Sequence, residues 1–282
     1  MKFGISIFPT DLTLQPPDIA RAVEERGFES LWFPEHSHIP VSRRSPWGGK
    51  VGAPPLPDFY SRTHDAFVAL GAAAAVTTRI RLATGITLVP QRDHVWLAKE
   101  VASLDSLSGG RFIFGVGYGW NKEEMASHGV RYTERRALMR EKILLMKELW
   151  TKEVASFDGG EIQLEPSWGW PKPVQKPHPP IIMGGDAGPK TIADMVEFCD
   201  GWMPNARHDL IGRLETVRAA LTAAGRDPAS FEISAFSAVP DKERIQQLTD
   251  LGVARAIFNV PPKSPPEVLT RLDEYAQFVA AL

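Results

Sequence analysis

The sequence lacks the features that mark several classes of protein. Its 282 residues include one cysteine, Cys199, so it can form no internal disulfide and no metal site of several thiolates. Its 32 basic and 34 acidic residues leave a formal net charge of −2, which offers nothing to nucleic acid or to an anionic membrane. The first apolar run, Phe3 to Phe8, is too short for a signal peptide. We therefore expect a cytoplasmic protein with a small-molecule partner, with a homodimer left open.

What is present is a regular alternation of two kinds of segment. With 43% hydrophobic and 23% charged residues, the composition is that of an ordinary globular protein. Short apolar runs predict strands at 3–8, 30–33, 80–84, 112–116, 181–183, 201–203, 231–235 and 254–258. Between and after them, helices are predicted at 17–26, 64–77, 95–107, 134–150, 189–198, 210–224, 241–251 and 265–282.

This alternation predicts an α/β fold, a single (β/α)₈ TIM barrel formed by one domain over residues 1–282. Strands without polar alternation are buried on both faces, as in a parallel sheet. Two insertions interrupt the pattern. The Pro- and Gly-rich loop 34–63 follows the second strand and is expected to act as a lid, and the segment 151–180, with a hairpin near Asp158, is expected to wrap the barrel.

Glycines follow two of the predicted strands. The run Gly115-Val116-Gly117-Tyr118-Gly119-Trp120 lets a ligand approach the backbone but lacks the spacing of a dinucleotide motif. The run 184–191, Gly184-Gly185-Asp186-Ala187-Gly188-Pro189-Lys190-Thr191, suits either a phosphate at a helix start or a tight turn. Asp186 is unfavourable beside a phosphate unless its carboxylate turns away or caps the helix.

Glu35, His36 and His38 follow the second strand, where barrels place catalytic groups. A carboxylate beside an imidazole suits proton transfer near neutral pH. A metal site is disfavoured because no companion cluster of ligands follows the other strands. Trp47, Trp120 and Trp202 are candidates for a substrate pocket, whereas Arg136 and its neighbours are expected on the exposed face of a helix.

Several of these segments together resemble the luciferase-like monooxygenase superfamily, in particular its branch of probable oxidoreductases that use the deazaflavin coenzyme F420 (also written F-420). The resemblance covers nearly the whole chain, and its most specific part runs from Leu97 to Trp120. It is also carried by the segments 31–36 (LWFPEH), 84–86 (TGI), 89–92 (VPQR), 180–185 (PIIMGG) and 200–204 (DGWMP).

The resemblance implies a TIM barrel that holds F420, or alternatively FMN, at the carboxyl ends of its strands. The implied cofactor-binding residues are His36, Thr84, Gly85, Ile86, Gly117, Tyr118, Gly119, Trp120, Gly184, Gly185 and Gly188. The family likeness also implies a cis peptide between Gly85 and Ile86. His36 would exchange a proton with the substrate, and Glu35 would be its electrostatic partner.

The function expected from this resemblance is hydride transfer between F420 and a small organic substrate. An FMN-dependent monooxygenase is the near alternative, and a non-catalytic flavin-binding relative is a second one. A Schiff-base aldolase is disfavoured because no lysine ends a predicted strand.

Overall fold

Eight parallel strands form a closed barrel in the computed structural model, which describes residues 1–207 and 210–282. The hydrogen-bonded order is β3-β2-β1-β11-β10-β9-β8-β5, and pairing of β3 with β5 closes the ring. The barrel strands are β1 Lys2–Ser6, β2 Ser30–Phe33, β3 Arg81–Thr84, β5 Phe112–Gly117, β8 Ile181–Gly184, β9 Gly201–Met203, β10 Glu232–Phe236 and β11 Arg255–Asn259. The predicted barrel is confirmed, and its strands begin and end within two residues of the expected positions.

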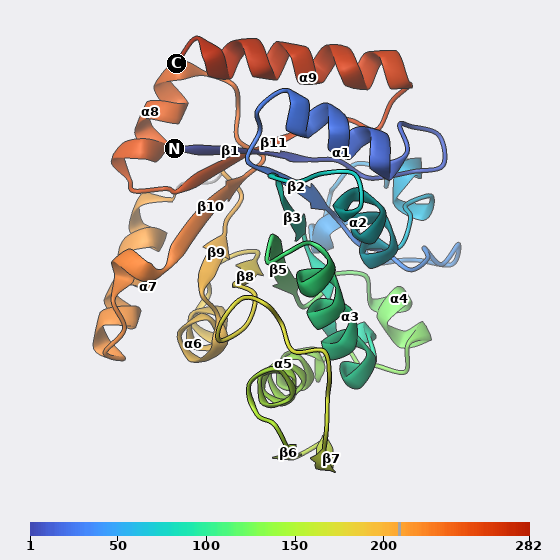
Figure 1. Cartoon of the computed structure of the whole chain (residues 1–282), viewed down its shortest axis with the longest axis vertical. Coiled ribbons are helices and arrows are strands. Elements are labelled where there is room, and N and C mark those ends of the chain that lie inside the picture. Colours follow the sequence, from blue (N-terminus) through green and yellow to red (C-terminus); the bar gives the residue numbers. More distant parts are fainter. Residues whose placement is uncertain (208–209) are drawn as a thin grey trace.

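A layer of helices surrounds this barrel (Figure 1). The helices that follow the barrel strands are α1 Pro16–Glu25, α2 Ala66–Ala74, α3 His94–Leu107, α5 Arg135–Thr151, α6 Pro189–Phe198, α7 Ile211–Ala223, α8 Lys242–Asp250 and α9 Pro265–Ala280. Six of these helices have a clear cause for their start: proline occupies the first turn of α1, α6 and α9, and aspartate side chains cap α2, α3 and α8.

Apolar side chains lie on both faces of the barrel wall. A small buried cluster from alternate strand positions fills the interior and comprises Trp32, Ala83, Ile113, Ile182, Met203 and Ile257. Their neighbours along the strands, such as Leu31 and Phe33, belong to a larger cluster between the barrel and the helices. Burial on both faces explains why the strands show no polar alternation in the sequence.

The end of the barrel at which the strands begin is closed by ion pairs. The fully buried guanidinium of Arg255 binds Glu29, with Nε to Oε2 at 2.7 Å, and also pairs with Glu232. It donates to Ser234 Oγ at 2.8 Å and lies 5.5 Å from the ring centre of Trp32. The carboxyl ends of the strands are therefore the end left for a ligand.

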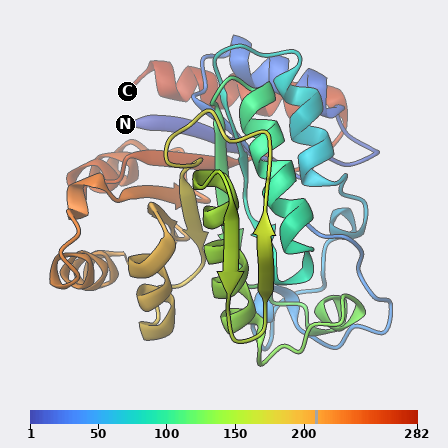
Figure 2. The same cartoon turned by 60° about the horizontal axis from the view of Figure 1, so that its bottom comes forward.

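The two insertions take the expected places. The 34–63 loop is irregular apart from two 3₁₀ turns, Trp47–Gly49 and Asp58–Ser61. The second insertion contains an antiparallel hairpin, β6 Ala155–Asp158 and β7 Gln163–Ser167, which Figure 2 shows alongside α5. After the hairpin the chain returns to α3, where the backbone N–H of Gln175 donates to the carboxylate of Asp105 at 2.9 Å.

Two short elements are absent from the sequence predictions. Strand β4, Thr87–Leu88, extends the edge of β5, and helix α4, Lys122–Ser127, follows the loop after β5. Both lie at the carboxyl ends of the strands, where the candidate site is built. Within the described ranges, no helix combines the length and apolar character needed to cross a bilayer.

Candidate active site

The peptide between Gly85 and Ile86 is cis, as the family resemblance implied. It lies between β3 and β4, where the pairing with β5 shifts by one residue between Ala83–Ile113 and Thr87–Val116. The extra residue makes a bulge at the carboxyl end of the barrel wall.

The side chain of Ile86 occupies the space next to two glycines of neighbouring strands. A Cβ on Gly117 of β5 would lie 2.6 Å from Ile86 Cδ1, and a Cβ on Gly184 of β8 would lie 2.5 Å from its Cγ2. These two glycines are therefore required by the close approach of Ile86. Gly117 lets the bulge pack against β5, and Gly184 lets it pack against β8.

Thr84 supports this bulge from inside the protein. Its side chain is fully buried, and its hydroxyl donates to the carbonyl oxygen of Gly115 at 2.8 Å. The hydroxyl of Thr84 therefore orients the neighbouring backbone, and a contact of Thr84 with the cofactor stays a prediction.

His36 is held by a residue that the sequence analysis did not identify. Its Nδ1 lies 2.7 Å from Oε2 of Glu124, and the side chains are 6% and 0% exposed. The other oxygen of Glu124 accepts the backbone N–H of Ser37 at 3.1 Å. Glu124 comes from the short helix α4, which begins after the capping side chain of Asn121 and carries two acidic residues in its first turn.

Glu35 is not the partner of His36. Its carboxylate accepts from Arg92 Nε at 2.5 Å and from the backbone N–H of Leu88 at 3.0 Å. Arg92 also binds Asp65 at 2.6 Å and Glu100 at 2.9 Å. The prediction of a Glu35–His36 pair is therefore wrong: Glu35 ties β4 and the turn after it to the start of the 34–63 loop, and Glu124 takes the place beside the imidazole.

Aromatic side chains cluster around His36. Tyr60 and Trp120 lie 5.2 and 5.8 Å from its ring centre, and Trp47 donates its indole N–H to the Tyr60 hydroxyl at 2.9 Å. Trp47 and Trp120 were expected here, whereas Tyr60 was missed because the irregular 34–63 loop gives no periodic signal. Arg43 lies over Trp120, 5.6 Å from its ring centre.

Trp202 does not belong to this aromatic cluster. It is 1% exposed and packs in the layer between the barrel and the helices, whereas its neighbour Met203 points into the barrel. Its prediction as a pocket wall is wrong because successive strand residues face opposite sides. Its indole N–H instead donates to the carbonyl oxygen of Gly185 at 2.7 Å and so fixes the loop after β8.

The loop after β8 leads into the N-terminus of α6 and presents backbone amides. Gly185 has φ +112°, a conformation that favours glycine, and Gly188 precedes Pro189 in the first turn of α6. Asp186 pairs with Arg213 at 3.1 Å, so its charge is partly compensated there. The loop thus has the donor groups that a phosphate needs.

Arg136 brings a guanidinium to this helix start, where it also pairs with Asp194 of α6 at 3.5 Å. Its guanidinium donates to Thr191 Oγ1 at 3.1 Å and stacks 3.9 Å from the ring centre of Tyr118. The Tyr118 hydroxyl donates to Asp194 of α6, and burial together with this acceptor raises the pKa of Tyr118. The expectation that Arg136 is simply an exposed helix residue is wrong, because it links α5, α6 and the loop after β5.

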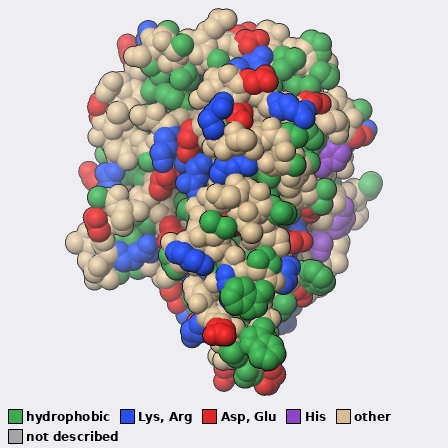
Figure 3. All heavy atoms as spheres, in the orientation of Figure 1, with side chains coloured by type: hydrophobic (Ala, Val, Ile, Leu, Met, Phe, Trp, Pro, Cys, Tyr) green, Lys and Arg blue, Asp and Glu red, His purple; other side chains and the backbone are tan. Residues whose placement is uncertain are grey.

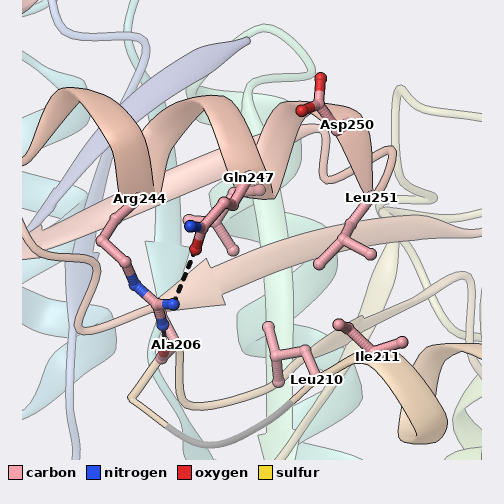
Figure 4. A pocket seen from close by; sticks show the side chains of 8 residues that line it. Ala206, Leu210, Ile211, Arg244, Gln247, Asp250 and Leu251 are labelled. Atoms are coloured by element: carbon pink, nitrogen blue, oxygen red, sulfur yellow. Dashed lines mark hydrogen bonds between the residues drawn. The ribbon is translucent and has the colours of Figure 1, made fainter.

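A second hollow lies away from the candidate site. This hollow, of about 290 Å³, lies between the start of α7 and α8, with Arg244 donating to Gln247 at 2.8 Å on one wall (Figure 4). It contains none of the predicted site residues. Among the described residues, no three His, Cys, Asp or Glu side chains are arranged to hold a metal ion. Figure 3 shows charges of both signs intermingled on the face it presents.

Histidines also lie beside the candidate site, near its surface. The Ser37 hydroxyl contacts His128 Nε2 at 2.7 Å and His38 Nδ1 at 3.0 Å. Burial lowers the pKa of His128, and the neighbouring His38 acts in the same direction. His38 therefore lies on the outer side of the His36 segment and has no contact with Glu124 among the hydrogen bonds of the described residues.

Comparison with known proteins agrees with this architecture. The model of the family described as luciferase-like monooxygenase matches residues 12–278. An uncharacterised protein of Mycobacterium tuberculosis is 38% identical over 99% of both chains. The F420-dependent hydroxymycolic acid dehydrogenase of the same organism is 29% identical over 82% of this chain and 61% of its own.

Two solved structures have a similar fold. The monooxygenase RslO1 from Streptomyces bottropensis has a TM-score of 0.79 and 21% identity, covering 100% of this chain and 99% of its own. An F420-dependent secondary alcohol dehydrogenase, in complex with an F420-acetone adduct, has a TM-score of 0.76 and 19% identity, covering 99% and 98%. The chain is an enzyme of the luciferase-like monooxygenase family.

Proposed function

We propose that this enzyme transfers a hydride between coenzyme F420 and a small organic substrate. The observation that carries the proposal is that His36 lies at the same barrel end as the Gly85–Ile86 bulge. His36 is held there by Glu124, whose Oε2 lies 2.7 Å from the imidazole Nδ1. That end can hold a planar cofactor and a proton-exchanging group together. The F420-dependent dehydrogenase among the relatives supports the choice of cofactor.

The described residues suit such a cofactor. The backbone at Gly85 and Ile86 would support the ring, and Gly117 and Gly184 leave no side chain that would displace Ile86. The amide of Gly188, the N-terminus of α6 and the Arg136 guanidinium would hold the phosphate. The N–H of Gly185 donates to the carbonyl oxygen of Met203 at 3.4 Å, so this glycine would contribute through its backbone conformation. Bound F420 supplies the carbon that gives or accepts the hydride.

The protein's own contribution is proton exchange and orientation. The Nε2 of His36 has no hydrogen-bond partner among the described residues, so it is available to a substrate oxygen. It would take the hydroxyl proton of an alcohol that is being oxidised, or return a proton to a carbonyl that is being reduced. Tyr60 and Trp120 would pack against the substrate and exclude water.

A cofactor titration tests this proposal. We expect purified protein to quench F420 fluorescence with saturation, and a panel of small alcohols and ketones to change the F420 absorbance only in the presence of enzyme. His36→Ala should abolish turnover and leave F420 binding within about threefold of wild type. Tight FMN binding with no affinity for F420 would overturn the choice of cofactor.

An FMN-dependent monooxygenase is the second candidate. The similarity to the monooxygenase RslO1 over the full chain supports it. The same barrel end would accept FMN or F420, each with its phosphate. The two candidates differ in one measurement, which is oxygen consumption with reduced FMN and substrate. Binding of either cofactor without any turnover would instead favour a non-catalytic role.

A further inference from the structure

The carboxylate of Glu124 contacts two successive residues after β2. Its Oε2 lies 2.7 Å from His36 Nδ1, and its Oε1 accepts the backbone N–H of Ser37 at 3.1 Å. The side chain is 0% exposed, so water cannot replace either contact. One buried group thereby sets both the place and the rotation of the His36 ring.

The helix that carries Glu124 is docked along the same loop at further points. The carboxylate of its neighbour Glu123 accepts the backbone N–H groups of Arg44 at 3.1 Å and Ser45 at 3.3 Å. His128, which caps the helix, contacts the Ser37 hydroxyl at 2.7 Å. A helix of six residues is too short to be stable alone, so these contacts determine its position.

We infer that Glu124 is a positioning residue that holds His36 as the tautomer with a proton on Nδ1 and leaves Nε2 for the substrate. A neutral imidazole carries its proton on either nitrogen, and an ionised carboxylate can only accept, so the contact selects Nδ1–H. The inference rests on the proposed function for its catalytic consequence. Its structural content concerns the protein without any ligand.

The consequence for hydride transfer follows from the proton balance. During alcohol oxidation, the O–H proton would pass to Nε2 of His36, and the C–H hydrogen would leave with the bonding electron pair as a hydride that oxidised F420 would accept, so that a carbonyl would form. Reduction of a carbonyl is the reverse. Glu124 touches neither substrate nor cofactor in this scheme, and its charge lies 2.7 Å from the imidazolium that forms.

The decisive experiment observes the tautomer directly. Protein labelled with ¹⁵N-histidine is studied without ligand by long-range ¹H–¹⁵N correlation, and His36→Gln assigns the His36 signals. At a pH where the ring is neutral, we expect the Nδ1–H pattern in wild type. In Glu124→Gln the side-chain amide can donate to Nδ1, so we expect the Nε2–H tautomer to appear.

Glu123→Gln is the matched control, because it removes the neighbouring carboxylate without touching His36. We expect it to keep the wild-type tautomer. Should Glu124→Gln fail to fold, Glu124→Asp keeps the charge on a shorter side chain and is expected to retain Nδ1–H. An Nε2–H pattern in wild type, or an unchanged Nδ1–H pattern in Glu124→Gln, would overturn the inference.

Kinetics separates positioning from mere stability. With F420 and an accepted alcohol, we expect Glu124→Gln to lower kcat by about tenfold or more, with the F420 Kd within about twofold of wild type. The His36→Asn, Glu124→Gln double variant should be no slower than His36→Asn alone. Additive losses would contradict action through His36. If F420 does not bind at all, the proposed function fails, and the tautomer result still decides the role of Glu124.

Discussion

The indole N–H of Trp202 donates to the carbonyl oxygen of Gly185 across 2.7 Å, and so joins β9 to the loop that follows β8. This loop carries the amides that the proposed phosphate site uses. A residue of the packing layer outside the barrel wall therefore fixes the backbone of the candidate site.

Trp202→Phe is expected to weaken cofactor binding as well as stability. The variant keeps an aromatic ring and leaves the Gly185 carbonyl without its donor, so the free energy of unfolding should fall by about 1–3 kcal/mol. The Kd for F420 or FMN should rise several-fold. Urea unfolding and a fluorescence titration measure the two effects, and Trp168→Phe, at a position 78% exposed, is the control. An unchanged Kd would contradict the loop's role.

Gly184→Ala should disturb the bulge through Ile86. The new Cβ would lie 2.5 Å from Ile86 Cγ2, which forces one of them to move and lowers the free energy of unfolding by about 1–3 kcal/mol. In an Ile86→Ala background, the same change should cost less, and urea unfolding of all four proteins tests this coupling. Gly188→Ala is the control, because its Cβ would meet no atom within 4 Å.

Arg136→Met should remove a preference for phosphate. A charge-assisted contact to phosphate is worth about 1.5–3 kcal/mol, so FMN affinity should fall by about tenfold or more. Riboflavin affinity should change little, because riboflavin carries no phosphate. Parallel titrations with the two compounds measure the ratio, and Arg140→Met on the same helix, which loses a pair with Glu197, is the control. Equal losses for both compounds would place the phosphate elsewhere.

Glu123 should make a stability contribution that depends on pH. Hydrogen bonds from the Ser45 hydroxyl and from the backbone N–H groups of Arg44 and Ser45 lower the pKa of Glu123 to about 2. Because the folded pKa lies below the ordinary value of 4.5, this contribution is present above pH 4.5 and is lost as the pH falls towards 2. Since the group is partly exposed to solvent, which screens its interactions, this contribution should reach no more than about 1 kcal/mol.

The measurement compares wild type with Glu123→Gln by urea unfolding between pH 2.5 and 7, where wild type should be more stable only at the upper end. Glu161→Gln, at an exposed position, is the control. A difference that stays constant over the whole pH range would show that packing of the side chain is responsible.

The sequence predicted the barrel well because each of its units has its own local signal. Proline or aspartate marks six of the eight helix starts, and the apolar runs of strands such as β2 and β9 give their bounds without error. Helix α4 was missed because six residues carry too little periodicity. Trp202 was misplaced because a strand of three residues does not reveal which of its side chains face the interior.

The pairing within the site was harder to predict for a different reason. Glu124 lies 88 residues from His36, and only closure of the barrel brings the two loops together. Glu35 is next to His36 in sequence, but its neighbours in space, Leu88 and Arg92, come from β4 and from the end of the turn that follows it. Adjacency along the chain therefore favoured the wrong carboxylate.

The ion pairs of Arg255 with Glu29 and Glu232 have a consequence for the order of events in turnover. They close the end of the barrel at which the strands begin, so in the proposed reaction cofactor, substrate and product would all enter and leave at the other end. A substrate bound over the cofactor would block its exit. We therefore expect the cofactor to load first and leave last, as in an ordered sequential reaction.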